Sequence, residues 1–96
     1  MSTNKAHHEL GLLVREYRIK NNMTQFNLAQ KLGYDSTHFV SLFERGVSKI
    51  PYQTMGQLIV ILGIPEKKIM KTLVSAYEQE VREKIESGKS LVAKTL

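Results

Sequence analysis

The chain has 96 residues, a net charge of +5 and no cysteine. This length suffices for one domain with a modest core, and the absence of cysteine excludes disulfides and thiolate metal sites. The longest apolar run, residues 58–62, is far too short to cross a membrane, and the N-terminus lacks the apolar block of a signal peptide. We therefore expect a cytoplasmic protein without a membrane partner, whose basic charge favours a polyanion.

Residues 1–9 are expected to form a flexible N-terminal segment, with the first helix starting inside it at about Ala6 and reaching Asn21. A zinc-protease helix would read HExxH, but the pair His8-Glu9 is followed by Leu12 where the second histidine would stand. We therefore expect no metal site here. The apolar stripe of this helix, at positions i, i+3, i+4 and i+7, consists of Leu10, Leu13, Val14 and Tyr17.

Residues 24–46 are predicted to form two short helices joined by a tight turn. Gly33 is suited to ending the first helix, because glycine adopts a left-handed backbone without steric penalty. Ser36 is the predicted N-cap of the helix that follows Gly33, the third helix of the chain, in which Val40 and Phe43 share the inward face. The other face of this third helix carries Thr37, His38, Ser41 and Leu42.

These residues resemble the helix-turn-helix domains of the phage-repressor (Cro/C1, XRE) family. The likeness covers about residues 10–70 and rests on three motifs. They are Thr24-Gln25 at the opening of the second helix, the LAQKLG sequence from Leu28 to Gly33, and the closing Glu44-Arg45-Gly46. The resemblance implies an all-α, compact five-helix fold in which the third helix reads DNA.

The chain departs from the commonest family pattern in two places. It has one additional residue between Gly33 and Glu44, which we place in the turn at Tyr34-Asp35 because Ser36 keeps the usual distance to Glu44. An additional residue inside the helix would instead rotate the reading face by about 100°. The second departure is Phe39, a large aromatic where the family usually has a small polar residue, which can turn inward.

The resemblance implies roles for particular residues. Arg18 would form an ion pair with Glu44, which ends the third helix; the alternative is a solvated surface arginine. Side chains of the third helix would contact base edges, while Gln25, Arg45 and Lys49 would contact phosphates. The complete set of expected DNA contacts is Gln25, Ser36, Thr37, His38, Ser41, Leu42, Arg45 and Lys49.

Two prolines, Pro51 and Pro65, are predicted in the first turns of the fourth and fifth helices. The fourth helix is expected to end at about Leu62 and the fifth at about Glu86, leaving residues 87–96 as a tail. Residues 71–86 extend beyond the domain, and we expect a second copy of the chain to cover their apolar side chains. The alternative is that this helix folds back on its own domain. The predicted dimerisation residues are Leu73, Tyr77, Val81 and Ile85.

These patterns predict a bacterial or phage transcriptional regulator that binds double-stranded DNA. We expect a repressor that acts as a homodimer on a palindromic operator. The competing interpretation is an antitoxin or adaptor whose last helix binds a different protein. An enzyme is the least supported class, because no nucleophile, base and orienting residue stand at a recognisable spacing. We expect no cofactor and no small-molecule ligand.

Overall fold

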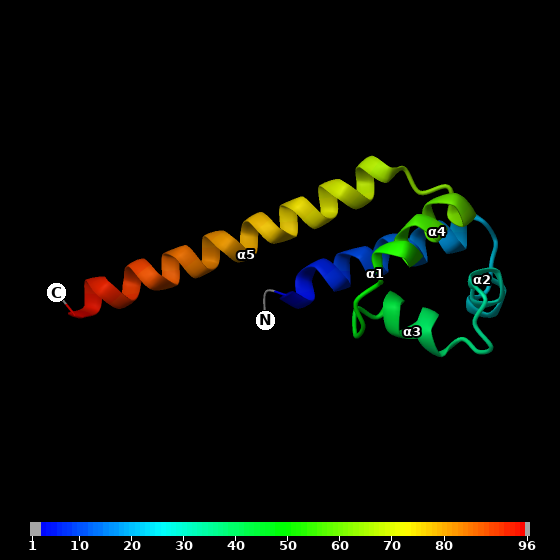
Figure 1. Cartoon of the computed structure of the whole chain (residues 1–96), viewed down its shortest axis with the longest axis horizontal. Coiled ribbons are helices and arrows are strands. Elements are labelled where there is room, and N and C mark those ends of the chain that lie inside the picture. The colour runs from blue at the N-terminus through cyan, green and yellow to red at the C-terminus, as the bar shows by residue number, and fades with distance from the viewer. Residues whose placement is uncertain (1–2, 96) are drawn as a thin grey trace.

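A computed structural model describes residues 3–95, with side-chain exposure from Lys5 onward, as five α-helices without a strand (Figure 1). The predicted all-α fold of five helices with a long C-terminal helix is confirmed. Within these residues, no helix combines the length and the apolarity needed to cross a membrane. The helices are α1 (Thr3–Lys20), α2 (Gln25–Leu32), α3 (His38–Glu44), α4 (Tyr52–Leu62) and α5 (Glu66–Thr95).

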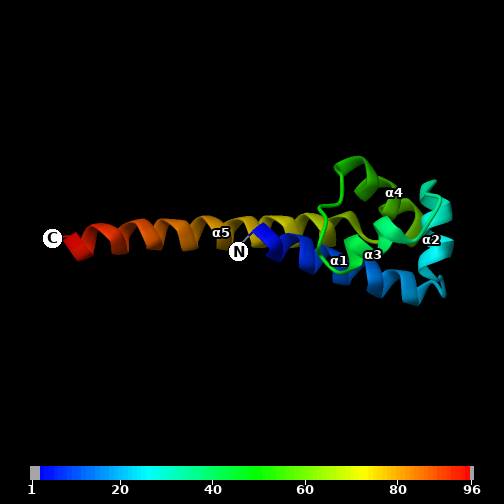
Figure 2. The ribbon, with the colours of Figure 1, turned by 90° about the horizontal axis from the view of Figure 1, so that it is seen from below.

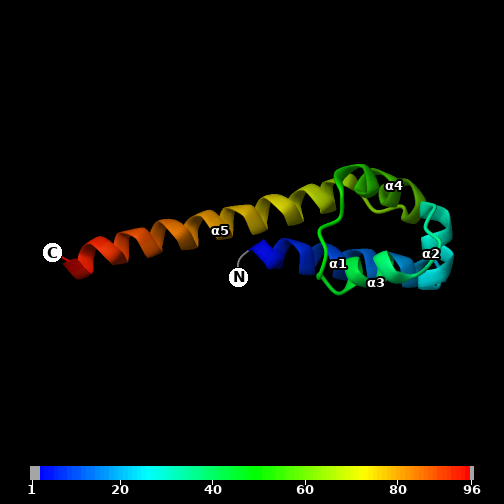
Figure 3. The ribbon, with the colours of Figure 1, turned by 60° about the horizontal axis from the view of Figure 1, so that its bottom comes forward.

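Helix α1 is the centre of the arrangement, with α3 on one side and the first half of α5 on another (Figures 1 and 2). Helix α5 runs antiparallel to α1, because Lys68 hydrogen-bonds Tyr17 near the end of α1 and Lys5 hydrogen-bonds Gln79 near its start. Lys68 Nζ donates to Tyr17 Oη at 3.0 Å, and this bond raises the pKa of Lys68. Helices α2 and α4 close the end of the domain away from the free end of α5 (Figure 3).

The core joins residues from all five helices and from the two connections that flank α4. The predicted stripe of α1 contributes to it, with Leu10 and Val14 buried and Leu13 and Tyr17 partly buried against it. Burying such side chains is the main source of stability in a chain of this size. The core residues are Leu10, Val14, Leu28, Ala29, Leu32, Val40, Phe43, Ile50, Met55, Leu58, Leu62, Ile64 and Ile69.

Helix α2 has strong signals at both ends. Thr24 Oγ1 accepts from the backbone N–H of Asn27, and Asn27 Oδ1 accepts from the backbone N–H of Thr24, each at 3.0 Å. This reciprocal capping box satisfies two donors that the helix leaves unpaired. Gly33 ends the helix with a left-handed backbone, φ 86°, as its position after Leu32 predicts.

Two predicted boundaries are wrong. Helix α1 begins at Thr3, so residues 3–9 are helical rather than a flexible segment, and residues 1–2 lie outside the described part of the chain. Helix α5 does not end at Glu86 but continues through Ser87 and Gly88 to Thr95, so most of the predicted tail is helical. A single interior glycine costs a helix only about 1 kcal/mol, which Lys, Leu and Ala residues beyond Gly88 offset because they favour helix. Lys89 also reaches back to Glu86 across this point, at 3.0 Å.

Candidate nucleic-acid interface

The turn between α2 and α3 is held by aromatic rings. Residues 33–37 connect the two helices. The Tyr34 ring lies 5.2 Å from that of Phe39 and 6.5 Å from that of Phe43. Phe39 is only half turned inward, since 48% of it remains exposed. Its visible role is to pack the turn against α3.

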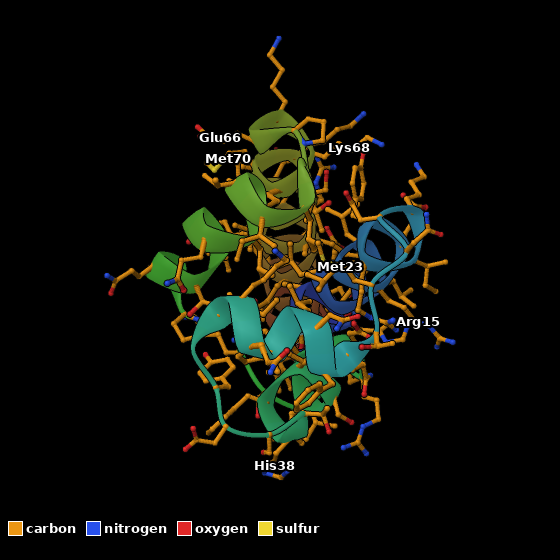
Figure 4. All side chains as sticks on the ribbon, turned by 90° about the vertical axis from the view of Figure 1, so that its right-hand side faces the viewer. Arg15, Met23, His38, Glu66, Lys68 and Met70 are labelled. Carbon is orange, nitrogen blue, oxygen red and sulfur yellow. The ribbon has the colours of Figure 1, made fainter. Side chains whose placement is uncertain are left out.

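Helix α3 has a buried and an exposed face. Val40 and Phe43 are buried, as predicted. His38 and Arg45 are exposed, and Ser41 and Leu42 between them are half-buried. At 100° per residue these four side chains fall on one face. Figure 4 places His38 on the side of the domain opposite Glu66, Lys68 and Met70 of α5, so this face points away from α5.

The N-terminus of α3 differs slightly from the predicted cap. The helix begins at His38, and Thr37 stands at the cap position, where its side chain makes no capping bond and is half-buried. Ser36 Oγ nevertheless accepts from the backbone N–H of His38, at 3.3 Å. The Ser36 hydroxyl therefore serves the first helical N–H from one residue farther out than predicted.

The expected ion pair of Arg18 and Glu44 is present and two-pronged. Arg18 Nε lies 2.6 Å from Glu44 Oε2, and Arg18 Nη2 donates to Glu44 Oε1 at 3.1 Å. The third guanidinium nitrogen, Nη1, donates to the carbonyl of Met23 at 2.8 Å. The Glu44 side chain is only 3% exposed. This geometry ties the last turn of α3 to the end of α1 and to the segment before α2.

Gln25 lies in the same network, which changes its expected role. Its Nε2 donates to Glu44 Oε1 at 3.1 Å, and the side chain is half-buried. The structure therefore directs this amide inward, where it orients the carboxylate, rather than toward a phosphate. A phosphate contact through the same nitrogen would require breaking that bond. The backbone N–H groups at the start of α2 are the alternative donors of this helix.

Gly11 is a residue that the sequence analysis missed. A Cβ atom at this position of α1 would lie 2.2 Å from the carbonyl oxygen of Phe43 and 2.8 Å from that of Glu44. The close approach of α1 to the end of α3, which lets Arg18 reach Glu44, therefore requires glycine. The available signal was a glycine inside a strongly periodic helix, which usually marks a packing constraint.

The two expected cationic anchors have different surroundings. Arg45 Nε donates to the carbonyl of Ser41 at 3.3 Å, so this exposed side chain lies along α3. Lys49 is also exposed, but its amine lies 4.8 Å from the centre of the Tyr52 ring. It borders a cavity of about 330 Å³ between α1, α4 and α5. The position of Lys49 next to α5 makes Arg45 the better candidate for a phosphate contact beside α3.

The predicted dimerisation residues differ in how far they are exposed. Leu73 is partly buried against the core of its own domain, so the structure places it in the domain rather than on a free surface. Tyr77, Val81 and Ile85 are exposed, as a surface for a second chain requires. Leu73 packs into the domain, whereas Tyr77 lines the edge of the cavity beside α1 and keeps 68% of its surface exposed. Val81 and Ile85 follow Gln79, which Lys5 contacts near the start of α1.

Within residues 3–95, no three His, Asp or Glu side chains are grouped so that they could hold a metal ion. No protein-family model matches the chain, and neither a curated protein nor a solved structure matches it significantly. The likeness to phage-repressor domains therefore rests on the sequence motifs of this chain alone.

Proposed function

We propose that the protein is a sequence-specific transcriptional regulator that binds double-stranded DNA with α3 in the major groove. The observation that carries this proposal is the exposed face of α3, on which His38, Ser41, Leu42 and Arg45 are aligned. An α-helix fits the major groove of B-DNA, where short polar side chains reach base edges. The buried face of the same helix is fixed by the core and by Glu44, which gives the exposed face a defined orientation.

The charges around α3 suit a polyanion. The chain carries a net charge of +5, and the carboxylate of Glu44 is buried against Arg18. Arg45 is then the cation nearest the exposed face of α3, in a position to bind a phosphate beside the groove. His38 can donate to or accept from a base, and Leu42 can pack on a thymine methyl group.

A single domain of this size makes few DNA contacts, so regulators of this kind usually bind as dimers to two related half-sites. The exposed apolar side chains of α5 supply a surface for such a dimer. The simplest regulatory action is repression, in which the bound dimer blocks access to a promoter, controlled by the concentration of the protein.

The decisive experiment is selection of bound duplexes from a random DNA pool at near-physiological salt, with the mass of the complex measured in parallel. We expect an enriched inverted repeat bound by two chains. Binding to all duplexes alike, with affinity that falls steeply with salt, would contradict sequence-specific recognition.

Two substitutions separate base reading from phosphate binding on the selected duplex. His38→Ala should relax the preference at particular base pairs by about 1–3 kcal/mol. Arg45→Ala should weaken binding to all sequences and reduce the salt slope by about one unit. Lys49→Ala is the matched control, and the same loss there as for Arg45→Ala would mean that Lys49 is a phosphate contact after all.

A second candidate function is that of an antitoxin or adaptor that binds a different protein through α5. The observation in its favour is that every described residue from Val81 to Thr95 is exposed. This alternative requires a chain that stays monomeric by itself at high micromolar concentration and enriches no duplex. A dimer with an enriched inverted repeat contradicts it.

A further inference from the structure

The apolar side chains of α5 form two separate faces. One consists of Ile69, Leu73 and Ala76, which are buried or partly buried in the domain. The other lies about 110° away around the helix, at 100° per residue, and its side chains are exposed. We call this second face the α5 stripe; it consists of Met70, Val74, Tyr77, Val81, Ile85, Gly88 and Val92.

The α5 stripe is long and nearly straight. Its members recur at intervals of four, three, four, four, three and four residues, close to the period of the α-helix itself. The α5 stripe therefore runs along one side of the helix, the C-terminal part of which projects beyond the domain (Figure 1). A second helix could contact the whole stripe without strong supercoiling.

Antiparallel pairing of two stripes about Val81 matches large side chains with complementary ones. Val81 then meets Val81 of the second copy, and Ile85 meets Tyr77. Gly88, where an added Cβ would meet nothing within 4 Å, lies opposite Val74 and leaves room for it. Met70 at one end of the stripe meets Val92 from the other end.

The charged residues beside the stripe agree with the same register. Glu78 of one copy lies beside Arg82 of the second, and Glu80 lies beside Lys84. Within each chain the same residues already make contacts one turn apart, Glu78 with Arg82 at 4.0 Å and Glu80 with Lys84 at 3.4 Å. Both flanks of the antiparallel pair thus alternate in sign. A parallel pair would instead bring Lys84 beside Lys89 of the second copy.

The cavity beside α5 accepts a side chain in the antiparallel register only. It is lined by apolar residues that include Leu10, Met55 and Leu73, and it opens next to Tyr77 on one flank of the stripe. Leu91 lies on that flank and is exposed in the single chain. In the antiparallel pair Leu91 of the second copy reaches the level of Leu73, at the cavity; in a parallel pair it lies far from it.

The position of α3 in the domain also favours the antiparallel pair. The domain is attached to one side of α5, and α3 lies beyond α1 on that side (Figures 1 and 4). In an antiparallel pair the two-fold axis is perpendicular to the plane of the two helices, so both domains lie on the same side of that plane. In a parallel pair the axis runs along the helices, and the two α3 helices face opposite directions. Only the antiparallel pair offers both to one straight duplex.

We propose that α5 pairs antiparallel with α5 of a second copy, about a two-fold axis at Val81, with Leu91 of each chain seated in the cavity of the other. The last point, on α3, rests on the DNA-binding function proposed above, whereas the stripe, the flanking charges and the cavity do not.

Engineered cysteines test the register, because the natural chain contains none. Under mild oxidation of the full-length chain without DNA, Val81→Cys should give a disulfide-linked dimer. Val92→Cys alone should remain monomeric on a non-reducing gel, whereas a mixture of Met70→Cys and Val92→Cys chains should give the mixed dimer. Ser90→Cys, exposed on the opposite side of the helix, is the control for random collision.

Efficient self-linking of Val92→Cys, comparable to that of Val81→Cys, would establish a parallel pair and overturn the proposal. A monomeric mass for the unmodified chain at high micromolar concentration, with no link beyond the Ser90→Cys level, would overturn it as well. Failure of the DNA function is scored separately by duplex selection with the unmodified chain. Disulfide links in the antiparallel register without an enriched duplex would support the pairing of α5 and contradict the proposed DNA-binding function.

Discussion

Helix α3 and the projecting half of α5, residues 81–95, are helices with opposite sources of order. Helix α3 spans only His38–Glu44, too short to be stable alone, yet it is held by the core, by Gly11 and by the pair of Arg18 and Glu44. Residues 81–95 form a longer helical segment in which every residue is exposed. The difference teaches that α3 depends on contacts within the chain, whereas the proposed second copy would supply the contacts that cover residues 81–95.

The largest expected effect comes from breaking the network that holds α3. Glu44→Ala should lower the free energy of unfolding by about 3–5 kcal/mol, because it leaves the largely buried Arg18 guanidinium without its carboxylate. Chemical denaturation monitored by circular dichroism measures the change. Lys20→Ala is the control: its pair with Glu16, at 3.7 Å, is exposed on both sides, and its loss should cost under about 1 kcal/mol. Equal losses for the two variants would contradict the role of the Arg18 pair.

The next effect concerns the approach of α1 to α3. Gly11→Ala should destabilise the fold by about 1–3 kcal/mol, since the new methyl group would meet backbone oxygens that cannot move independently. Gly56→Ala in α4 is the matched variant, because nothing lies within 4 Å of its added Cβ. This second change should stabilise the protein by about 0.5–1 kcal/mol through helix propensity. Chemical denaturation measures both changes. If both alanine substitutions stabilised the protein, the packing role of Gly11 would be contradicted.

Hydrogen exchange tests whether the projecting half of α5 is stabilised by a second copy of the chain. In dilute protein the amides of residues 82–95 should exchange rapidly, since an isolated helix of this length is marginal in water. They should become protected as the concentration rises and α5 pairs, while the amides of α2 and α3 stay protected throughout. Ile85→Glu should abolish the concentration dependence without altering the denaturation midpoint of the dilute chain. Protection of residues 82–95 that is strong and independent of concentration would contradict the need for an external partner.

The smallest expected effect comes from the flanking charges of the α5 stripe. Glu80→Lys and Lys84→Glu should each weaken self-association by up to about 1 kcal/mol per exposed pair. A mixture of the two variants should form the mixed dimer in preference to either homodimer, because the antiparallel register pairs opposite charges at both places. Native mass spectrometry reports the proportions. If the dimers form in statistical proportions, at low salt as well, these charges do not determine the register.

The predictable part of the molecule is local. Gly33, Pro51 and the apolar spacing in α1 indicated helices or their ends within a few residues, because these signals act over one or two turns. The predicted end of the last helix at about Glu86 was wrong, because the glycine that follows at position 88 permits a helix end but does not impose one. Arg18 and Glu44 were paired through the family resemblance, since their separation of 26 positions carries no local signal.

By itself, the sequence determined an all-helical chain with a short helix pair, an exposed polar face on α3 and a long apolar last helix. Only the tertiary structure decided that Gly11 is a contact point, that Gln25 turns inward and that Lys49 lies beside α5. It also divided the apolar residues of α5 into a buried and an exposed face. The physical reason is that helical periodicity specifies which residues share a face, whereas the packing of other helices decides which face is covered.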